Sequence, residues 1–224
     1  MEEKIKVLGI EMDCLTAKDA MKRAIQFLEG SLLESIGIIP MDMLLAGQED
    51  SEWRERVGQL QMILPGEKEI LEAAGIEDRQ ILRETEERTF LRMFMKYLQK
   101  NHRRVYLLAE TDEELTRVED AVRRHNRGIR ITGHALIRPG ENREENVINE
   151  INGTETDCIL SVLSSPYQEE FAARGRALLN VKVWMGCGSA LWRSYDESKM
   201  SVRIRRFFLK KIFRHRVERQ QMGK

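Results

Sequence analysis

The sequence predicts an α/β fold, with a Rossmann-like, mostly parallel sheet that carries helices on both faces, followed by a C-terminal basic amphipathic helix. Along the 224 residues, short runs rich in β-branched residues alternate with longer stretches whose apolar residues recur at helical spacing. Such alternation is typical of parallel sheets, because each parallel connection needs a crossover, usually a helix. The last 26 residues are strongly basic, unlike the rest of the chain.

Seven runs are expected to be strands and at least four stretches to be helices. The expected strands are Lys4–Ile10, Ile36–Pro40, Leu60–Leu64, Arg104–Ala109, Ile129–His134, Asp157–Leu163 and Val181–Met185. The expected helices are Ala17–Leu28, Glu84–Gln99, Thr111–His125 and Gln168–Leu179. Thr16 and Thr111 stand where N-caps are favoured, and the polar stretch Pro139–Glu145 is expected to be a loop.

Composition narrows the class of protein. A hydrophobic share of 42% and a charged share of 33% are those of a soluble globular chain rather than a disordered one. No apolar run approaches the roughly 18–20 residues that cross a bilayer, and the first residues do not resemble a secretory signal. Cys14, Cys158 and Cys187 lack metal-site spacing, which favours reduced thiols in the cytoplasm and no metal site.

The net charge of zero conceals two parts of opposite sign. Residues 199–224 hold ten Lys or Arg and one Glu, a net charge of +9, so residues 1–198 carry −9. We therefore expect a domain over 1–198 and a basic appendage over 199–224. As a helix, the appendage would carry the apolar residues Ile204, Phe207, Phe208 and Ile212 beside the cations Arg203, Arg205, Arg206, Lys210, Lys211 and Arg214.

The cations and apolar residues of this appendage favour its binding to an anionic membrane surface, where both kinds of side chain add to the binding free energy. The alternative is a helix that packs on the domain or on another subunit, as a homo- or hetero-oligomer. Nucleic acid is not favoured, because no recognised module or aromatic stacking platform accompanies the charge.

The functional site is expected at the carboxyl edge of the sheet, since ligands of open parallel sheets bind beyond the carboxyl ends of the strands. The residues placed there by the predicted strands are Glu11–Asp13, Pro40–Asp42, Pro65–Glu67, Glu110, His134–Ala135, Ser164–Gln168 and Gly186–Ser189. No glycine-rich phosphate loop supports a plain nucleotide-binding module.

Five segments, in order, resemble the WecG/TagA/CpsF family of glycosyltransferases. They are Lys6–Thr16, Asp42–Leu44 with Gln48–Glu52, Arg104–Leu108, Asp157–Leu160 with Ser165–Glu169, and Val183–Ser189. The most specific is the fourth, which is similar to the family's D-h-h-h-V-x-h-G-x-P-x-Q-E segment, where h is a hydrophobic residue. The order and spacing agree over residues 5–195.

The resemblance implies an inverting, metal-independent transfer of an N-acetylhexosamine from a UDP-sugar, without a cofactor. The acceptor would be an amino sugar on a polyprenyl diphosphate, at the inner face of the cell membrane, in cell-surface polysaccharide or teichoic acid synthesis. Glu67 is the expected base, because the attacking hydroxyl must lose its proton. The residues expected to bind substrate are Asp13, Asp42, Tyr167, Gln168, Glu169, Gly186 and Gly188, and the tail cations would help to hold the diphosphate.

Several polar positions of the family pattern are changed in this chain. The family's T-x-N falls on Ile38 and Pro40, and the aspartate of its P-D-G falls on Gly66, one residue before Glu67. Its G-G after the central strand includes Glu110, a negative side chain where a diphosphate favours bare backbone. Two hypotheses therefore stay open: an active, diverged glycosyltransferase, or a catalytically inactive member that acts as a partner or regulator of a related enzyme.

The candidate site residues could also serve the fold rather than a ligand. Glu67 would complement the N-terminus of its own helix, and the glycines after the last strand would permit a tight turn. An open cavity lined by Glu67 and Gln168 would favour sugar transfer. A cavity filled by Ile38 and Met41 would count against it.

Overall fold

The computed structural model describes residues 3–188, 190–193 and 200–222, and the side chains within 4–188, 190–191 and 209–220. The strands are β1 (Glu3–Val7), β2 (Ile10–Cys14), β3 (Glu34–Ile39), β4 (Met62–Pro65), β5 (Arg104–Ala109), β6 (Arg130–Leu136), β7 (Cys158–Ser161) and β8 (Val183–Gly186). The helices are α1 (Ala17–Glu29), α2 (Met41–Ala46), α3 (Ser51–Gly58), α4 (Lys68–Ala73), α5 (Arg79–Glu86), α6 (Thr89–Lys100), α7 (Asp112–His125), α8 (Glu144–Gly153), α9 (Tyr167–Gly175), α10 (Ala190–Arg193) and α11 (Met200–Met222).

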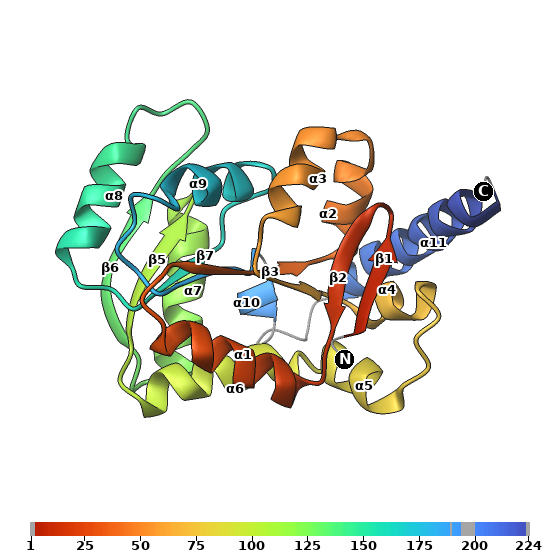
Figure 1. Cartoon of the computed structure of the whole chain (residues 1–224), viewed down its shortest axis with the longest axis horizontal. Helices are drawn as coiled ribbons and strands as arrows, with labels where there is room; N and C mark the ends of the chain where they lie inside the picture. Colours follow the sequence, from red (N-terminus) through yellow and green to blue (C-terminus); the bar gives the residue numbers. More distant parts are fainter. Residues whose placement is uncertain (1–2, 189, 194–199, 223–224) are drawn as a thin grey trace.

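Strands β3 to β8 form one sheet in the order β4-β3-β8-β7-β5-β6, and all of its pairings are parallel. Figure 1 shows α1 and α6 side by side below the sheet, with α8 and α9 on the opposite side. The expected α/β fold, a parallel sheet with helices on both faces, is confirmed.

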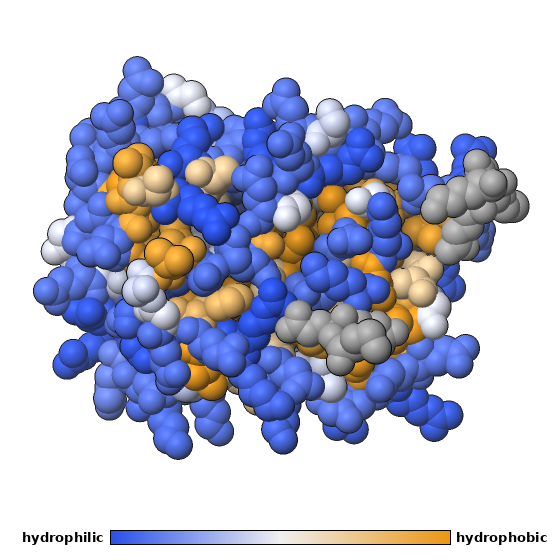
Figure 2. All heavy atoms as spheres, viewed as in Figure 1, coloured by the Kyte–Doolittle hydropathy of each residue, from blue (hydrophilic) through white to orange (hydrophobic). Residues whose placement is uncertain are grey.

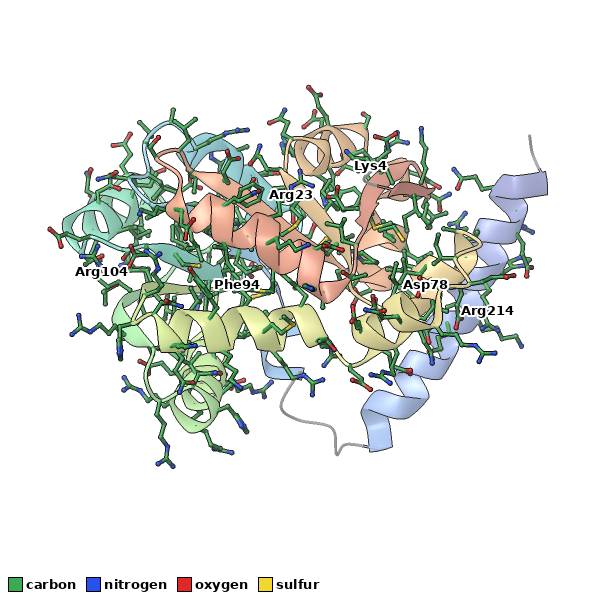
Figure 3. The ribbon with its side chains drawn as sticks, turned by 60° about the horizontal axis from the view of Figure 1, so that its bottom comes forward. Lys4, Arg23, Asp78, Phe94, Arg104 and Arg214 are labelled. Carbon is green, nitrogen blue, oxygen red and sulfur yellow. The ribbon has the colours of Figure 1, made fainter. Side chains whose placement is uncertain are left out.

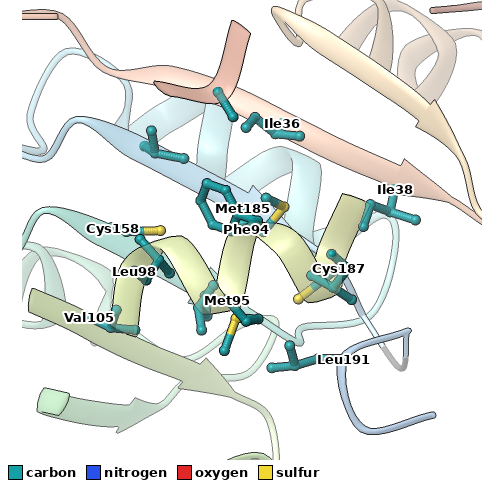
Figure 4. Close-up of a cluster of buried hydrophobic side chains, with 14 of the residues drawn as sticks. Ile36, Ile38, Phe94, Met95, Leu98, Val105, Cys158, Met185, Cys187 and Leu191 are labelled. Carbon is teal, nitrogen blue, oxygen red and sulfur yellow. The ribbon is translucent and has the colours of Figure 1, made fainter. Parts of the chain in front are cut away.

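Strand β5 contributes to two cores, because successive side chains of a strand point to opposite faces. Val105 and Leu107 join the core beneath α1 and α6, and Tyr106 and Leu108 join the core beneath α8 and α9. Figure 4 shows the first core, in which Phe94 of α6 points toward the sheet and is fully buried. Burial on both faces explains why the parallel strands appear in the sequence as apolar runs.

The first expected strand, Lys4–Ile10, is wrong, because the chain reverses at Leu8 and Gly9. β1 and β2 form an antiparallel hairpin outside the parallel sheet, with Val7 paired to Ile10. The turn residues have φ values of 49° and 88°, the positive values that a two-residue type I′ turn requires at both central positions. Leucine is rarely found at positive φ, so the apolar run gave no sign of a turn.

The helix predictions succeed at the caps and fail at two boundaries. Thr16 and Thr111 are N-caps, and each hydroxyl accepts the N–H of the third residue along at 3.2 Å. The expected helix Glu84–Gln99 is divided between α5 and α6, because Arg88 lies between them with a positive φ of 52°. The expected loop Pro139–Glu145 leads into α8, a helix that the pattern missed.

The expected basic C-terminal helix is present as α11, and its described part packs on the domain. Leu209, Phe213 and Val217, spaced four residues apart, join the core formed with the hairpin, α2 and α4. Phe213 is fully buried. Figure 3 shows α11 running along one end of the molecule, with Arg214 on it.

The surface shows no large apolar face in the view of Figure 2, where apolar residues emerge in separate groups among hydrophilic ones. The large hydrophobic side chains described as exposed come from four different segments and are Leu32, Met93, Leu178 and Ile212. Within the described ranges, no helix combines the length and apolar character needed to cross a membrane.

Candidate functional site

A cavity opens at the carboxyl edge of the sheet, where a parallel sheet is expected to bind ligands. Its walls come from the segments that follow β3, β7 and β8 and from α2, α3 and α7. It contains about 980 Å³ of space that is continuous with solvent. We call it the edge cavity; its lining includes Ile38, Asp42, Asp50, Glu114, Ser164 and Gly188.

The charged groups that line the edge cavity are acidic. Asp42, Asp50 and Glu114 contribute carboxylates, and the described lining residues include no Lys, Arg or His. Ile38 and Pro40 also line it, at the two positions where the family pattern has polar side chains. The cavity therefore offers negative charge and apolar surface rather than cationic groups.

Carboxylates around the edge cavity accept hydrogen bonds from the chain's own backbone. Asp42 and Asp50 accept N–H groups in the first turns of α2 and α3, at 3.0 and 2.9 Å. Glu110, directly after β5, accepts both the N–H and the hydroxyl of Ser164, with an N···O distance of 2.6 Å. The N–H of Glu110 is in turn 3.3 Å from the carboxylate of Glu114. The backbone N–H groups of Met43, Trp53, Glu110 and Ser164 are thus bonded to carboxylates and not free for an anionic ligand.

Glu67, the expected base, lies at the N-terminus of α4 and is 9% exposed. Its Oε2 accepts the backbone N–H of Met41 at 2.9 Å, so the carboxylate caps α2 and makes no cap bond to its own helix. Glu67 is absent from the described residues that line the edge cavity.

Position 66 leaves no room for a side chain. Gly66 donates its N–H to the carbonyl of Ile39 at 2.8 Å. A Cβ at this position would lie 3.0 Å from the Cα and 3.1 Å from the nitrogen of Pro40. Because these neighbours are backbone atoms, an aspartate at position 66 would require the segment at Pro40 to move.

Gln168 and Glu169 belong to a buried polar network behind the wall of the edge cavity. The Trp53 indole N–H donates to the Ser165 hydroxyl at 2.7 Å, and that hydroxyl donates to Glu169 at 2.8 Å. The Gln168 amide also donates to Glu169, at 3.2 Å. Burial raises the pKa of Glu169, and these hydrogen bonds oppose the shift. Trp53 and Ser165 line the edge cavity, whereas Gln168 and Glu169 lie outside its described lining.

The other candidate residues of this region lie in different surroundings. A Cβ at Gly186 would lie 2.9 Å from Nε2 of Gln168, so the glycine lets that amide pack against β8. Gly188 has a φ of 45° and lines the edge cavity. Tyr167 is buried and donates its hydroxyl to Glu144 at 3.1 Å. Burial, together with the Glu144 carboxylate, raises the pKa of Tyr167.

Asp13 joins the hairpin to the sheet. It lies on β2, is 3% exposed, and accepts the backbone N–H of Ile63 at 2.8 Å. Its second oxygen is 3.2 Å from Nη1 of Arg23 on α1. Because Ile63 belongs to the outer strand β4, Asp13 supplies an acceptor where a further strand would otherwise supply one.

The tail cations whose side chains are described divide between the domain and solvent. Lys210 forms an ion pair with Glu69, which is 2% exposed, and Nη2 of Arg214 is 3.6 Å from Glu72. Lys211 is exposed. Three further expected cations lie in α11 but outside the described side chains: Arg203, Arg205 and Arg206.

A second cavity, here called the apolar cavity, lies between α1, α5, α6 and the ends of β3 and β4, and contains about 560 Å³. Ile38 lines both cavities. Gly66 lines the apolar cavity, and Glu84 at its margin accepts the N–H of Ala17 at 2.6 Å. In the part of the chain that the structure describes, no group of three or more His, Cys, Asp or Glu is placed to hold a metal ion.

The sequence did not single out Asp50, Trp53 or Glu114 as site residues. Asp50 and Trp53 have the spacing of an N-cap and its third residue, a signal that locates a helix start but not the cavity beside it. Glu114 is an acid in the first turn of α7, a position that the helix dipole favours without any ligand. Their approach to the strand ends depends on how α3 and α7 pack on the sheet.

Comparison with known sequences gives one family for most of the chain. The sequence model of the family described as glycosyl transferase WecG/TagA/CpsF matches residues 5–201. A search among curated proteins found no match. The matched range includes the hairpin from Ile5 onward, the whole parallel sheet and every segment that lines the edge cavity. The chain therefore belongs to the WecG/TagA/CpsF glycosyltransferase family.

Proposed function

We propose that this chain keeps the fold of its family without transferring sugar, and that it acts as a partner or regulator of a related enzyme at an anionic membrane surface. The observation that carries the proposal is the charge of the edge cavity, with three carboxylates and no cation among its described lining residues. A metal-independent transfer must hold a leaving diphosphate with cationic side chains or free backbone N–H groups. Here the N–H groups of Met43, Trp53 and Ser164 are bonded to carboxylates, which would repel a diphosphate.

The proton acceptor that sugar transfer needs is also occupied by a backbone N–H group. A base must reach the acceptor hydroxyl directly or through one water. The carboxylate of Glu67 instead holds the N–H of Met41, and position 66 packs against the backbone of Pro40. The loss of a diphosphate site and of a free base together favour a role in binding.

Calorimetric titration of the full chain with UDP and with UDP-N-acetylglucosamine tests the loss of the donor site. We expect no saturable heat at millimolar nucleotide, because the edge cavity lacks groups that attract phosphate. Saturable binding of UDP or UDP-N-acetylglucosamine to the wild-type chain would contradict the proposal.

An active transferase is the second candidate, and the family match together with the open edge cavity favours it. It would transfer an N-acetylhexosamine from a UDP-sugar to an amino sugar on a polyprenyl diphosphate, with Glu67 as base. Release of UDP that depends on such a lipid acceptor would establish this candidate.

Attachment to an anionic membrane is proposed from the outward side of α11. Lys211, Arg216 and Arg219 are exposed, and Ile212 beside them is 57% exposed. The opposite side of the helix is occupied by the domain, through Phe213 and its neighbours. A docked helix can thus present cations and an apolar side chain to a lipid surface without leaving the domain.

Sedimentation with vesicles tests this attachment. We expect binding to vesicles that contain phosphatidylglycerol and at least about tenfold weaker binding to phosphatidylcholine alone, because each basic residue near an anionic surface contributes about 1 kcal/mol. A variant with Lys211→Glu, Arg216→Glu and Arg219→Glu should lose most of the binding. The matched control reverses three exposed cations elsewhere, at Lys18, Lys96 and Arg124, and equal loss in both variants would contradict attachment through α11.

A further inference from the structure

Glu110 lies outside the described lining of the edge cavity but bonds to Ser164, which lines it, and it differs from the acids of the lining in what it binds. Asp42, Asp50 and Glu114 accept N–H groups one to four residues away in the sequence. The carboxylate of Glu110 accepts the N–H and the hydroxyl of Ser164, which is 54 residues away. It therefore connects the end of β5 to the segment that follows β7, across the sheet edge.

Ser164 carries the kind of donors that a phosphate group would use. It lines the edge cavity, and it offers a backbone N–H and a hydroxyl on one residue at the carboxyl edge of the sheet. Paired donors of this kind bind phosphate or carboxylate oxygens in many α/β proteins. Both donors converge on one carboxylate oxygen of Glu110, with the N–H at 2.6 Å. The Glu110 carboxylate thus occupies the position that an oxygen of an anionic ligand would take.

We infer that Glu110 determines the selectivity of the edge cavity against phosphate-bearing ligands. It occupies both donors of Ser164 and adds a negative charge beside a cavity whose described lining contains no cation. The guanidinium of Arg138, outside that lining, donates to the backbone carbonyl of Glu110 at 2.8 Å. This inference rests on the proposed function, since it gives the reason why the cavity would not take a UDP-sugar. It also makes a separate prediction, that removal of one side chain opens an anion site.

Titration of Glu110→Ala with inorganic pyrophosphate tests the inference. Removal of the carboxylate frees the N–H and hydroxyl of Ser164, and charge-assisted hydrogen bonds to phosphate oxygens can then form. We expect the variant to bind pyrophosphate at least about tenfold more tightly than the wild-type chain at constant ionic strength. Circular dichroism and the Tm of the variant verify that it is folded.

Two further variants separate occupation of the donors from a change in net charge. Glu113→Ala removes the same charge from an exposed neighbour of Glu110 and should leave pyrophosphate binding unchanged. Glu110→Gln keeps a side chain of the same length with an acceptor for Ser164, so its affinity for pyrophosphate should rise less than that of the alanine variant. The inference is overturned if a folded Glu110→Ala binds pyrophosphate no more tightly than the wild-type chain. It is also overturned if Glu113→Ala or Glu110→Gln gains as much pyrophosphate affinity as Glu110→Ala.

The test distinguishes this inference from the proposed function. The proposed function is contradicted by UDP binding to the wild-type chain. The inference depends on the difference in pyrophosphate affinity between Glu110→Ala and Glu113→Ala, whatever the wild-type affinity for UDP.

Discussion

Replacement of Asp13 by alanine is expected to lower the free energy of unfolding by about 3–5 kcal/mol. The carboxylate is 3% exposed and serves two partners, the backbone N–H of Ile63 and the guanidinium of Arg23. Its removal leaves a buried donor on β4 without its acceptor and takes the carboxylate partner from Arg23. Urea unfolding of both proteins, with the midpoint and slope compared, measures the loss.

Asp13→Asn is the isosteric variant, which keeps one acceptor for Ile63 and loses the charge. We expect it to be destabilised less than Asp13→Ala, and the exposed Asp112→Ala to change stability by less than about 0.5 kcal/mol. If Asp13→Ala unfolded at the wild-type urea midpoint, this carboxylate would not anchor the hairpin to the sheet. A substrate role for Asp13 would then regain support.

Replacement of Phe213 by alanine is expected to cost about 3–5 kcal/mol of the free energy that holds α11 on the domain. The ring is fully buried in a core that includes Met41, Leu44 and Ile70. Because α11 follows the last strand of the sheet and packs on the domain from outside it, the helix can detach before the sheet unfolds. Limited trypsin digestion followed by mass spectrometry should therefore release tail peptides much faster from the variant.

Ile212→Ala is the matched control, since Ile212 is adjacent in the sequence and 57% exposed. We expect it to leave tail digestion at the wild-type rate. Equal digestion of Phe213→Ala and Ile212→Ala would show that the described part of α11 does not depend on this core. Vesicle binding by Phe213→Ala then indicates whether docking on the domain and binding to lipid compete.

The parallel sheet could be predicted from the sequence because its strands are buried on both faces. β5 and β7 appear as apolar runs between helical patterns, and the caps at Thr16 and Thr111 give the starts of α1 and α7. These signals are local, so they survive without knowledge of the tertiary structure. The hairpin was not predicted, because Leu8 occupies a turn position that usually favours glycine or asparagine.

The face of α11 that meets the domain could not be deduced from its own sequence. The expected apolar stripe ran through Ile212, which is exposed, whereas Phe213, one residue later, is buried. Both residues are apolar, and a segment rich in Phe and Ile allows more than one stripe. The packing of α11 against α2 and α4 decides which of them is covered.

The composition of the candidate site was only partly predictable. The strand ends were foreseen, and so was the negative charge of Glu110 where the family pattern has glycine. Its bond to Ser164 was not, because 54 residues separate the two and only the order β7-β5 of the sheet brings them together. The bond from Glu67 to Met41 likewise depends on β3 and β4 being neighbours.

The central claim is that the edge cavity of this chain is not a UDP-sugar site. The most direct measurement is an amide proton–nitrogen NMR spectrum of the full chain with and without millimolar UDP-N-acetylglucosamine, with resonances of Ser164 and Gly188 assigned. We predict that both resonances stay in place. Saturable shifts of Ser164 and Gly188 would place the nucleotide sugar in the edge cavity and contradict the claim.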